Sequence, residues 1–217
     1  LFIKGEELRL DSVLLADANV TLRIDSITPS DTTDTTVNRW RIEAARLDLQ
    51  RVGFTLQMPK DTLYLTTYLG NATLTGGYAD LAAERYGAAR LNLLAGYASY
   101  DASDRPRTEG LDPQHITASN IALLLDSVRY HAGDIRLALR DGSLDERSGL
   151  AIATVSAYVH IDSTAVSVSE CTLQTARSYI ELQAHVPWAA LSEQPTADLQ
   201  AEWAATIDGQ DVLTAMG

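Results

Sequence analysis

The sequence predicts an all-β protein built as an elongated antiparallel sheet with few or no helices. Apolar and polar residues alternate with a period of two from one end of the chain to the other, as in half-buried strands. Residues that favour tight turns separate many of these runs. No run of ten to fifteen residues has helical periodicity between the strands, so parallel β-α-β units are not expected.

Strands are expected wherever this alternation is regular. In the first half of the chain it marks residues 20–24, 40–44 and 91–97. In the second half it marks residues 121–125, 128–130, 135–139, 157–161, 166–168 and 180–186. Each of these strands would have one apolar face and one polar face.

Turns are expected where the alternation switches between odd and even positions. Asp and Gly at these switches suit tight turns, because Asp caps following amides and Gly accepts a positive φ. The predicted turns are Asp126-Ser127, Asp141-Gly142, His131 to Asp134, Gly76-Gly77 and Ser148-Gly149.

Two long loops and two short helical segments interrupt the strands. The loops are expected at 28–38 and 100–114, and the helical segments at 187–193 and 211–216. The second loop divides the chain into an N-terminal β segment, 1–99, and a C-terminal one, 115–217. One continuous sheet through both segments is the alternative.

A weak internal repeat suggests that some strands bend. Residues 42–49, 86–93 and 116–123 align without gaps and share an Ala followed by aliphatic residues three and five positions later. The step of three shifts the alternation, as a β-bulge would, so each copy is expected to bend its strand there. Repetition of this kind favours an elongated sheet over a compact sandwich.

Composition excludes several classes of protein. The 217 residues carry a formal net charge of −12 and no basic cluster, so nucleic acid is not an expected partner. The longest unbroken apolar run has five residues, 121–125, so no transmembrane segment is expected. Residues 1–4 are too short for a signal peptide. Cys171 is the single cysteine, which excludes an internal disulfide and a multi-cysteine zinc site.

No catalytic, cofactor or metal motif stands out, so we do not expect an enzyme. His131 is expected in a turn and His160 and His185 on polar strand faces, while Cys171 reads as a small buried apolar residue. The carboxylates of residues 141–146 lie beside arginines, as in a solvated turn. The tryptophans Trp40, Trp188 and Trp203 are expected in the core, with a glycan-stacking platform as the alternative.

The C-terminal half carries the most distinctive pattern. Residues 135–150 comprise a strand, a turn of acidic and basic residues, a Ser-Gly pair and an aliphatic position. Residues 169–178 lead from a strand to a Leu, a Thr and then a Ser, and residues 120–130 form an opening strand. Residues 205–213 look like the opening of a following unit. This arrangement resembles the repeating unit of TamB-like proteins of Bacteroidetes, relatives of the AsmA family.

The resemblance implies a long sheet curled like a taco, with an apolar concave face, in an envelope protein. Such proteins are anchored in the inner membrane and reach across the periplasm. They are associated with phospholipid movement to the outer membrane and with assembly of outer-membrane proteins beside an Omp85-type barrel. The chain would then be an interior, periplasmic fragment whose partner is phospholipid or an unfolded outer-membrane protein.

If the sheet curls, one set of aliphatic side chains would line a groove for acyl chains. These candidate lipid-binding residues are Ile121, Leu123, Leu125, Ile135, Leu137, Leu139, Val159 and Ile161. Two alternatives remain open from the sequence: a scaffold that adds client strands to exposed sheet edges, and a compact glycan-binding sandwich.

Five Asp-Ser or Asp-Thr triplets resemble the O-glycosylation acceptor pattern of Bacteroides-type bacteria. They begin at positions 11, 25, 61, 126 and 162. A turn leading into a strand has the same composition, so the triplets leave modification and plain turn structure as alternatives.

Overall fold

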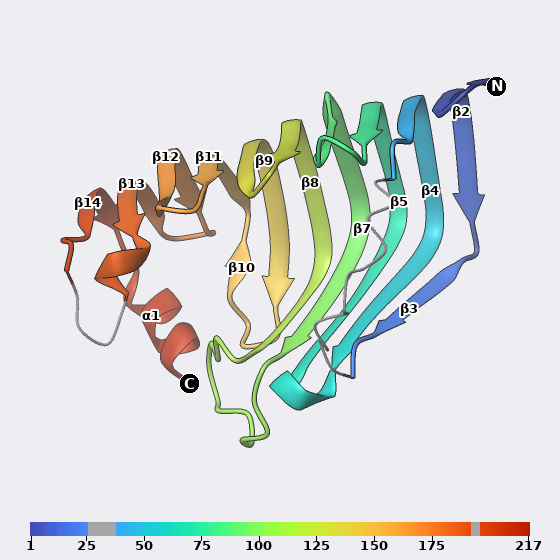
Figure 1. Cartoon of the computed structure of the whole chain (residues 1–217). Helices are drawn as coiled ribbons and strands as arrows, with labels where there is room; N and C mark the ends of the chain where they lie inside the picture. The colour runs from blue at the N-terminus through green and yellow to red at the C-terminus, as the bar shows by residue number, and fades with distance from the viewer. Residues whose placement is uncertain (26–37, 192–195) are drawn as a thin grey trace.

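A single curved sheet of 14 strands makes up most of the computed structural model (Figure 1). The structure describes residues 1–25, 38–191 and 196–217. The all-β prediction is confirmed. The strands are β1 (Phe2–Lys4), β2 (Glu7–Ala16), β3 (Asn19–Arg23), β4 (Arg41–Met58), β5 (Leu63–Asp80), β6 (Arg85–Ala88), β7 (Arg90–Asp101), β8 (His115–His131), β9 (Asp134–Glu146), β10 (Ala151–Ile152), β11 (Thr154–Ile161), β12 (Ala165–Gln174), β13 (Tyr179–Pro187) and β14 (Gln200–Thr206). The helical segments are η1 (Pro59–Asp61), η2 (Trp188–Ala190) and α1 (Gly209–Met216).

The strands follow the chain order closely across the sheet. Their order is β1-β2-β4-β5-β6-β8-β9-β11-β12-β13-β14, with β3 beside β4, β7 between β5 and β8, and β10 beside β9. Most neighbours are antiparallel, as predicted, but β2 and β3 both pair with β4 in parallel. Alternation alone does not reveal strand direction. Residues 24–40 are long enough for the crossover that a parallel pair requires.

The predicted loop at 100–114 is confirmed, since β7 ends at Asp101 and β8 begins at His115. It does not divide the protein, because β7 and β8 pair directly on either side of it. The described residues therefore follow the alternative of one continuous sheet. The other predicted loop, 28–38, falls outside the described residues except for Asn38. Both predicted helical segments contain helical turns, at η2 and α1, whereas η1 was not predicted.

The pairing register aligns apolar residues into rows that cross the sheet. The uppermost row passes through nine strand segments from β2 to β13 without a polar member. It consists of Leu8, Ile42, Ala79, Tyr86, Tyr130, Ile135, Ile161, Val166 and Val186. This row therefore makes the upper part of that face apolar across these strands.

The long strands bend where two consecutive residues face outward. On β4, Ala45 and Arg46 are both exposed between the half-buried Ala44 and Leu47. Gly76, on the adjacent β5, has a φ of 60°, and the register is the same on both sides of this point. Lower in the sheet a second line of bends runs through three residues with positive φ, Arg51, Ala95 and Asn120.

The apolar face lies on the inside of these bends. A Cβ added to Gly77 would lie 2.6 Å from Leu74 Cδ2, and one added to Gly96 would lie 3.0 Å from Leu93 Cδ2. In each pair the two residues are three apart along one strand and on either side of a bend. Their close approach shows that the sheet folds toward its apolar face.

The bends also explain which predicted turns were wrong. Asp126-Ser127, Asp141-Gly142 and Gly76-Gly77 lie inside β8, β9 and β5, where the alternation shifts at a bend rather than at a hairpin. The β8–β9 hairpin after His131 and the turn at Ser148-Gly149 are confirmed.

Each copy of the predicted repeat contains the shift in alternation. The copies at 42–49 and 86–93 bend at the same level of the sheet, on either side of Gly76. The copy at 116–123 bends lower in the sheet, on the line of bends that includes Asn120. It is the one copy whose pairing register shifts with both neighbouring strands, as at a β-bulge.

Candidate functional site

The concave apolar face forms an open trough, here called the apolar trough, whose long axis crosses the strands. Its lining comprises the inward residues of β2 to β13 in the rows described above. No second sheet or helical layer covers it within the described residues. The accessible surface of the chain is 14204 Å². A compact protein of the same mass would expose about 9,800 Å². The accessible surface of this chain is larger because a sheet of one layer leaves both of its faces in contact with solvent.

All eight predicted groove-lining residues lie on this face. Ile121 is 9% exposed and buried, and the other seven are half-buried. Cross-strand pairs join them directly, including Leu125 with Leu139, Leu137 with Val159, and Ile135 with Ile161. None is fully exposed and, among the described residues, no side chain of any kind is completely buried.

The side chains of the trough are most buried along its middle. Leu93, which is 6% exposed, forms a small core with Ala72, Ala118 and Ile121. The half-buried hydrophobic residues packed against this core are Leu49, Leu69, Ala98, Leu123 and Leu144. This band holds the bent strands together and forms the floor of the trough, while the rows above it stay more open.

The apolar lining does not stop at the two sides of the sheet. On the β3 side, Val20 and Leu22 are each 48% exposed and pair with Phe54 and Leu56. On the β14 side, Trp203 is 69% exposed and pairs with Leu182. Among residues 1–25, 38–191 and 196–217, no element closes the trough at either end of its axis.

Helix α1 lies beside the lower ends of the shorter strands (Figure 1). Asp211 accepts hydrogen bonds from the Thr175 and Ser178 hydroxyls, with Asp211 Oδ2 2.5 Å from Thr175 Oγ1 and 2.6 Å from Ser178 Oγ. The donor from Ser178 contributes most to holding the pKa of Asp211 below its usual value. Further along, the Leu111 amide donates to the Ala215 carbonyl. The helix thus connects the β12–β13 turn with the 102–114 loop.

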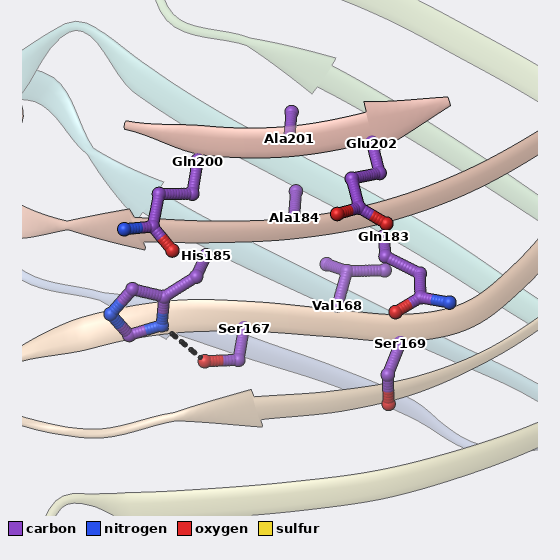
Figure 2. Close-up of a pocket in the computed structure, with 9 residues that line it drawn as sticks. All are labelled: Ser167, Val168, Ser169, Gln183, Ala184, His185, Gln200, Ala201 and Glu202. Carbon is purple, nitrogen blue, oxygen red and sulfur yellow. Dashed lines mark hydrogen bonds between the residues drawn. The ribbon is translucent and has the colours of Figure 1, made fainter. Parts of the chain in front are cut away.

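The convex face is mainly polar at β12 to β14. Figure 2 shows the alternation at β12 to β14, where Ser167, His185 and Gln200 point to one side and Ala184 and Ala201 to the other. The lining of the shallow depression drawn there is otherwise Val168, Ser169, Gln183 and Glu202. This depression is wide open and belongs to the outside of the sheet.

His160 and His185 lie on this polar face, as predicted. His160 Nε2 is 3.0 Å from Asp134 Oδ2, and Arg136 Nε donates to Asp134 Oδ1 at 2.9 Å. The hydrogen bonds from Arg136, and secondly from His160, lower the pKa of Asp134 to about 2. His185 Nδ1 lies 2.9 Å from Ser167 Oγ. These contacts join neighbouring strands across their outer face.

A further His-Asp pair fastens the long loop. His115 Nδ1 is 3.0 Å from Asp101 Oδ1, and Arg107 donates to the same oxygen at 2.7 Å. The bond from Arg107 is the main reason that the pKa of Asp101 is lowered. The His115 side chain is 6% exposed, and the trio ties the loop to the ends of β7 and β8.

Several predictions about single residues were wrong. Trp40, Trp188 and Trp203 are 38%, 42% and 69% exposed rather than in the core. They lie before β4, on η2 and on β14, so they do not form one stacking platform. Glu146 is buried instead of solvated, because it accepts from the Thr117 and Ser148 amides.

Cys171 is half-buried next to Leu182, and burial raises the pKa of its thiol. The described residues include no group of three or more His, Cys, Asp or Glu side chains placed to hold a metal ion. None of the helices in the described ranges has both the length and the apolar character needed to cross a bilayer.

Comparison with protein-family models, with curated proteins and with solved structures finds no match to this chain. The trough therefore has to be interpreted from its own geometry. Sequence reasoning identified the residues that line it. It missed the α1 contact, because Thr175 and Ser178 lie more than 30 residues before Asp211 and nothing local connects them.

Proposed function

We propose that this chain is a periplasmic segment of a TamB-like envelope protein whose apolar trough shields phospholipid acyl chains from water between the two membranes. The observation that supports this proposal is the uncovered apolar row that crosses nine strand segments from Leu8 to Val186. An antiparallel sheet usually covers its apolar face with a second layer. A bound apolar guest would take the place of that layer.

The dimensions suit acyl chains. Strands about 4.8 Å apart make a row across nine segments about 38 Å long. The hydrocarbon core of a bilayer is about 30 Å thick, so one leaflet's acyl chain spans about 15 Å. Each buried methylene group contributes about 0.8 kcal/mol without any directional contact. A trough lined by aliphatic side chains can therefore hold an acyl chain at many positions along its length.

This function needs no catalytic group and no cofactor. The charged residues of the described sheet lie on its convex face and at the ends of its strands, as Arg136, Asp134 and Asp101 do. A polar headgroup would remain in water at the rim while the acyl chain lies against the apolar rows. Anchoring of the full-length protein in the inner membrane and cooperation with an Omp85-type barrel belong to the same proposal.

The test is native mass spectrometry of the protein purified from a bacterial host. We expect phospholipid to accompany the wild type and to be lost from Leu137→Asp and Leu123→Asp, because a carboxylate in the trough would have to be desolvated. Leu14→Asp is the matched control, since Leu14 is 62% exposed and pairs with Asp48 on the convex face. Circular dichroism would verify that each variant keeps its sheet.

The proposal fails if the folded Leu137→Asp protein keeps as much lipid as the wild type, or if Leu14→Asp loses as much. A lipid-free wild type that binds an extended outer-membrane-protein peptide would point to a polypeptide client instead.

A further inference from the structure

A shallow depression on the convex face is lined by basic residues, although the chain as a whole is acidic. It has a volume of about 370 Å³ and lies over β8, β9, β11 and β12. The basic and hydroxyl side chains in its lining are Arg129, Arg136, His160, Ser127, Ser167 and Ser169. No described carboxylate belongs to this lining, whereas the adjoining depression in Figure 2, which shares Ser167 and Ser169, includes Glu202.

The basic residues lie side by side in one row that crosses the strands. Arg129 on β8 lies directly opposite Arg136 on β9, and Arg136 lies opposite His160 on β11. Directly opposite residues have Cβ atoms about 4.5–5.5 Å apart, and like charges in such a pair destabilise a sheet. The two guanidinium groups therefore need negative charge close to both of them.

Asp134 supplies negative charge to Arg136 but not to Arg129. Arg136 donates from Nε to Asp134 Oδ1 at 2.9 Å and from Nη2 to Oδ2 at 3.1 Å. Asp134 Oδ2 also lies 3.0 Å from His160 Nε2. Arg129, by contrast, forms no ion pair with any carboxylate in the described part of the chain. The charge of Arg129 is therefore left uncompensated at the depression.

A small residue forms the floor of the depression. Ala138 lies between Ser127 and Tyr158 in the next row across the strands. Its methyl group leaves a space that a larger side chain would fill. The hydroxyls of Ser127 and Ser169 form no hydrogen bond with another described residue, and Tyr158 is 53% exposed. Two guanidinium groups, two available hydroxyls and one aromatic ring thus border the space above Ala138.

We infer that this depression binds a phosphate group, free or as the monoester of a sugar, with Arg129 and Arg136 as its charged donors. A guanidinium group has five N–H donors and can contact two oxygens of a phosphate at once. Asp134 accepts from two N–H groups of Arg136, which leaves the others available. A phosphate has enough acceptor oxygens for both guanidinium groups and the serine hydroxyls together. It also supplies the negative charge that Arg129 lacks.

The depression is separate from the apolar trough. Arg129 and Ser127 flank Val128 on β8, so their side chains lie on the opposite face of the sheet from this inward residue. The sheet itself therefore separates the depression from an acyl chain held in the trough. The exposed ring of Tyr158, beside the floor, offers a flat surface for a sugar attached to the phosphate.

Isothermal titration calorimetry of the full chain, in phosphate-free buffer of low ionic strength, tests the inference. The probes are inorganic phosphate and glucose 6-phosphate, and we expect saturable binding with one site per chain. Arg129→Gln and Arg136→Gln should each raise the dissociation constant about tenfold, the loss expected for one charged hydrogen bond. Arg39→Gln is the matched control, because it removes one positive charge at an exposed residue before β4 and should leave the constant unchanged. Circular dichroism would verify that each variant folds.

The two probes distinguish the source of the phosphate. Tighter binding of glucose 6-phosphate that Tyr158→Ala removes would identify a sugar phosphate, whereas equal binding of both probes would identify the free anion. Phosphate should also raise the Tm of the wild type, and Arg129→Gln in phosphate-free buffer should melt no lower than the wild type, because it relieves the repulsion from Arg136.

Three results would overturn the inference. The first is no binding of either probe to the folded wild type. The second is equal weakening by Arg39→Gln and Arg129→Gln, which would mean that only the overall charge matters. The third is binding of acetate as tightly as phosphate.

Discussion

Replacing Leu93 by alanine should destabilise the protein far more than the same change at other leucines of the trough. Leu93 is 6% exposed and packs in the small core with Ala72 and Ile121. A buried leucine truncated to alanine costs about 2–5 kcal/mol, and we expect about 3 kcal/mol here. Leu14, which is 62% exposed on the convex face, should cost less than about 1 kcal/mol.

Thermal and urea denaturation followed by circular dichroism would measure these differences. For a chain of this length about 3 kcal/mol corresponds to a Tm lower by about 6–12 °C. Leu137→Ala should fall between the two, because Leu137 is only half-buried. If Leu137→Ala costs as much as Leu93→Ala, the upper rows are sealed rather than open and the reasoning about the trough is refuted.

Two further predictions concern side chains outside the trough. Asp134 has its pKa lowered to about 2 by Arg136 and His160, so its contribution to stability is present above the ordinary carboxyl pKa and is lost as the pH falls toward 2. The urea midpoint should therefore fall less steeply with acid in Asp134→Asn than in the wild type; equal slopes would contradict this. Asp211→Ala removes the acceptor of the Ser178 hydroxyl, so hydrogen exchange in α1 should become faster while β4 and β5 are unchanged. Unchanged exchange in α1 would mean that other contacts hold the helix.

The alternation of residues predicted the fold class and the inward face, because a strand with one dry side imposes a period of two whatever its neighbours are. It also placed all eight candidate trough residues on one face. The same signal misled at Asp126-Ser127 and Asp141-Gly142. A shift in alternation has the same local appearance at a hairpin and at a bend, and only the partner strand distinguishes them.

Features that depend on distant partners could not be derived from the sequence. Trp203 is exposed because β14 is an edge strand, and strand order across a sheet is not a local property. The parallel pairing of β2 with β4 depends in the same way on how residues 24–40 return the chain. The sequence predicts a solvent-exposed Glu146, because the Thr117 amide that it accepts from comes close only in the folded sheet.

The measurement that addresses the trough most directly is photo-cross-linking with a phospholipid that carries a diazirine on its acyl chain, followed by peptide mass spectrometry. The account predicts adducts on inward residues of the concave face, such as Leu137, Val159 and Ile161, and their loss in Leu137→Asp. Adducts confined to convex-face residues such as Leu14 and Tyr158, or no adducts on a correctly folded protein, would contradict it.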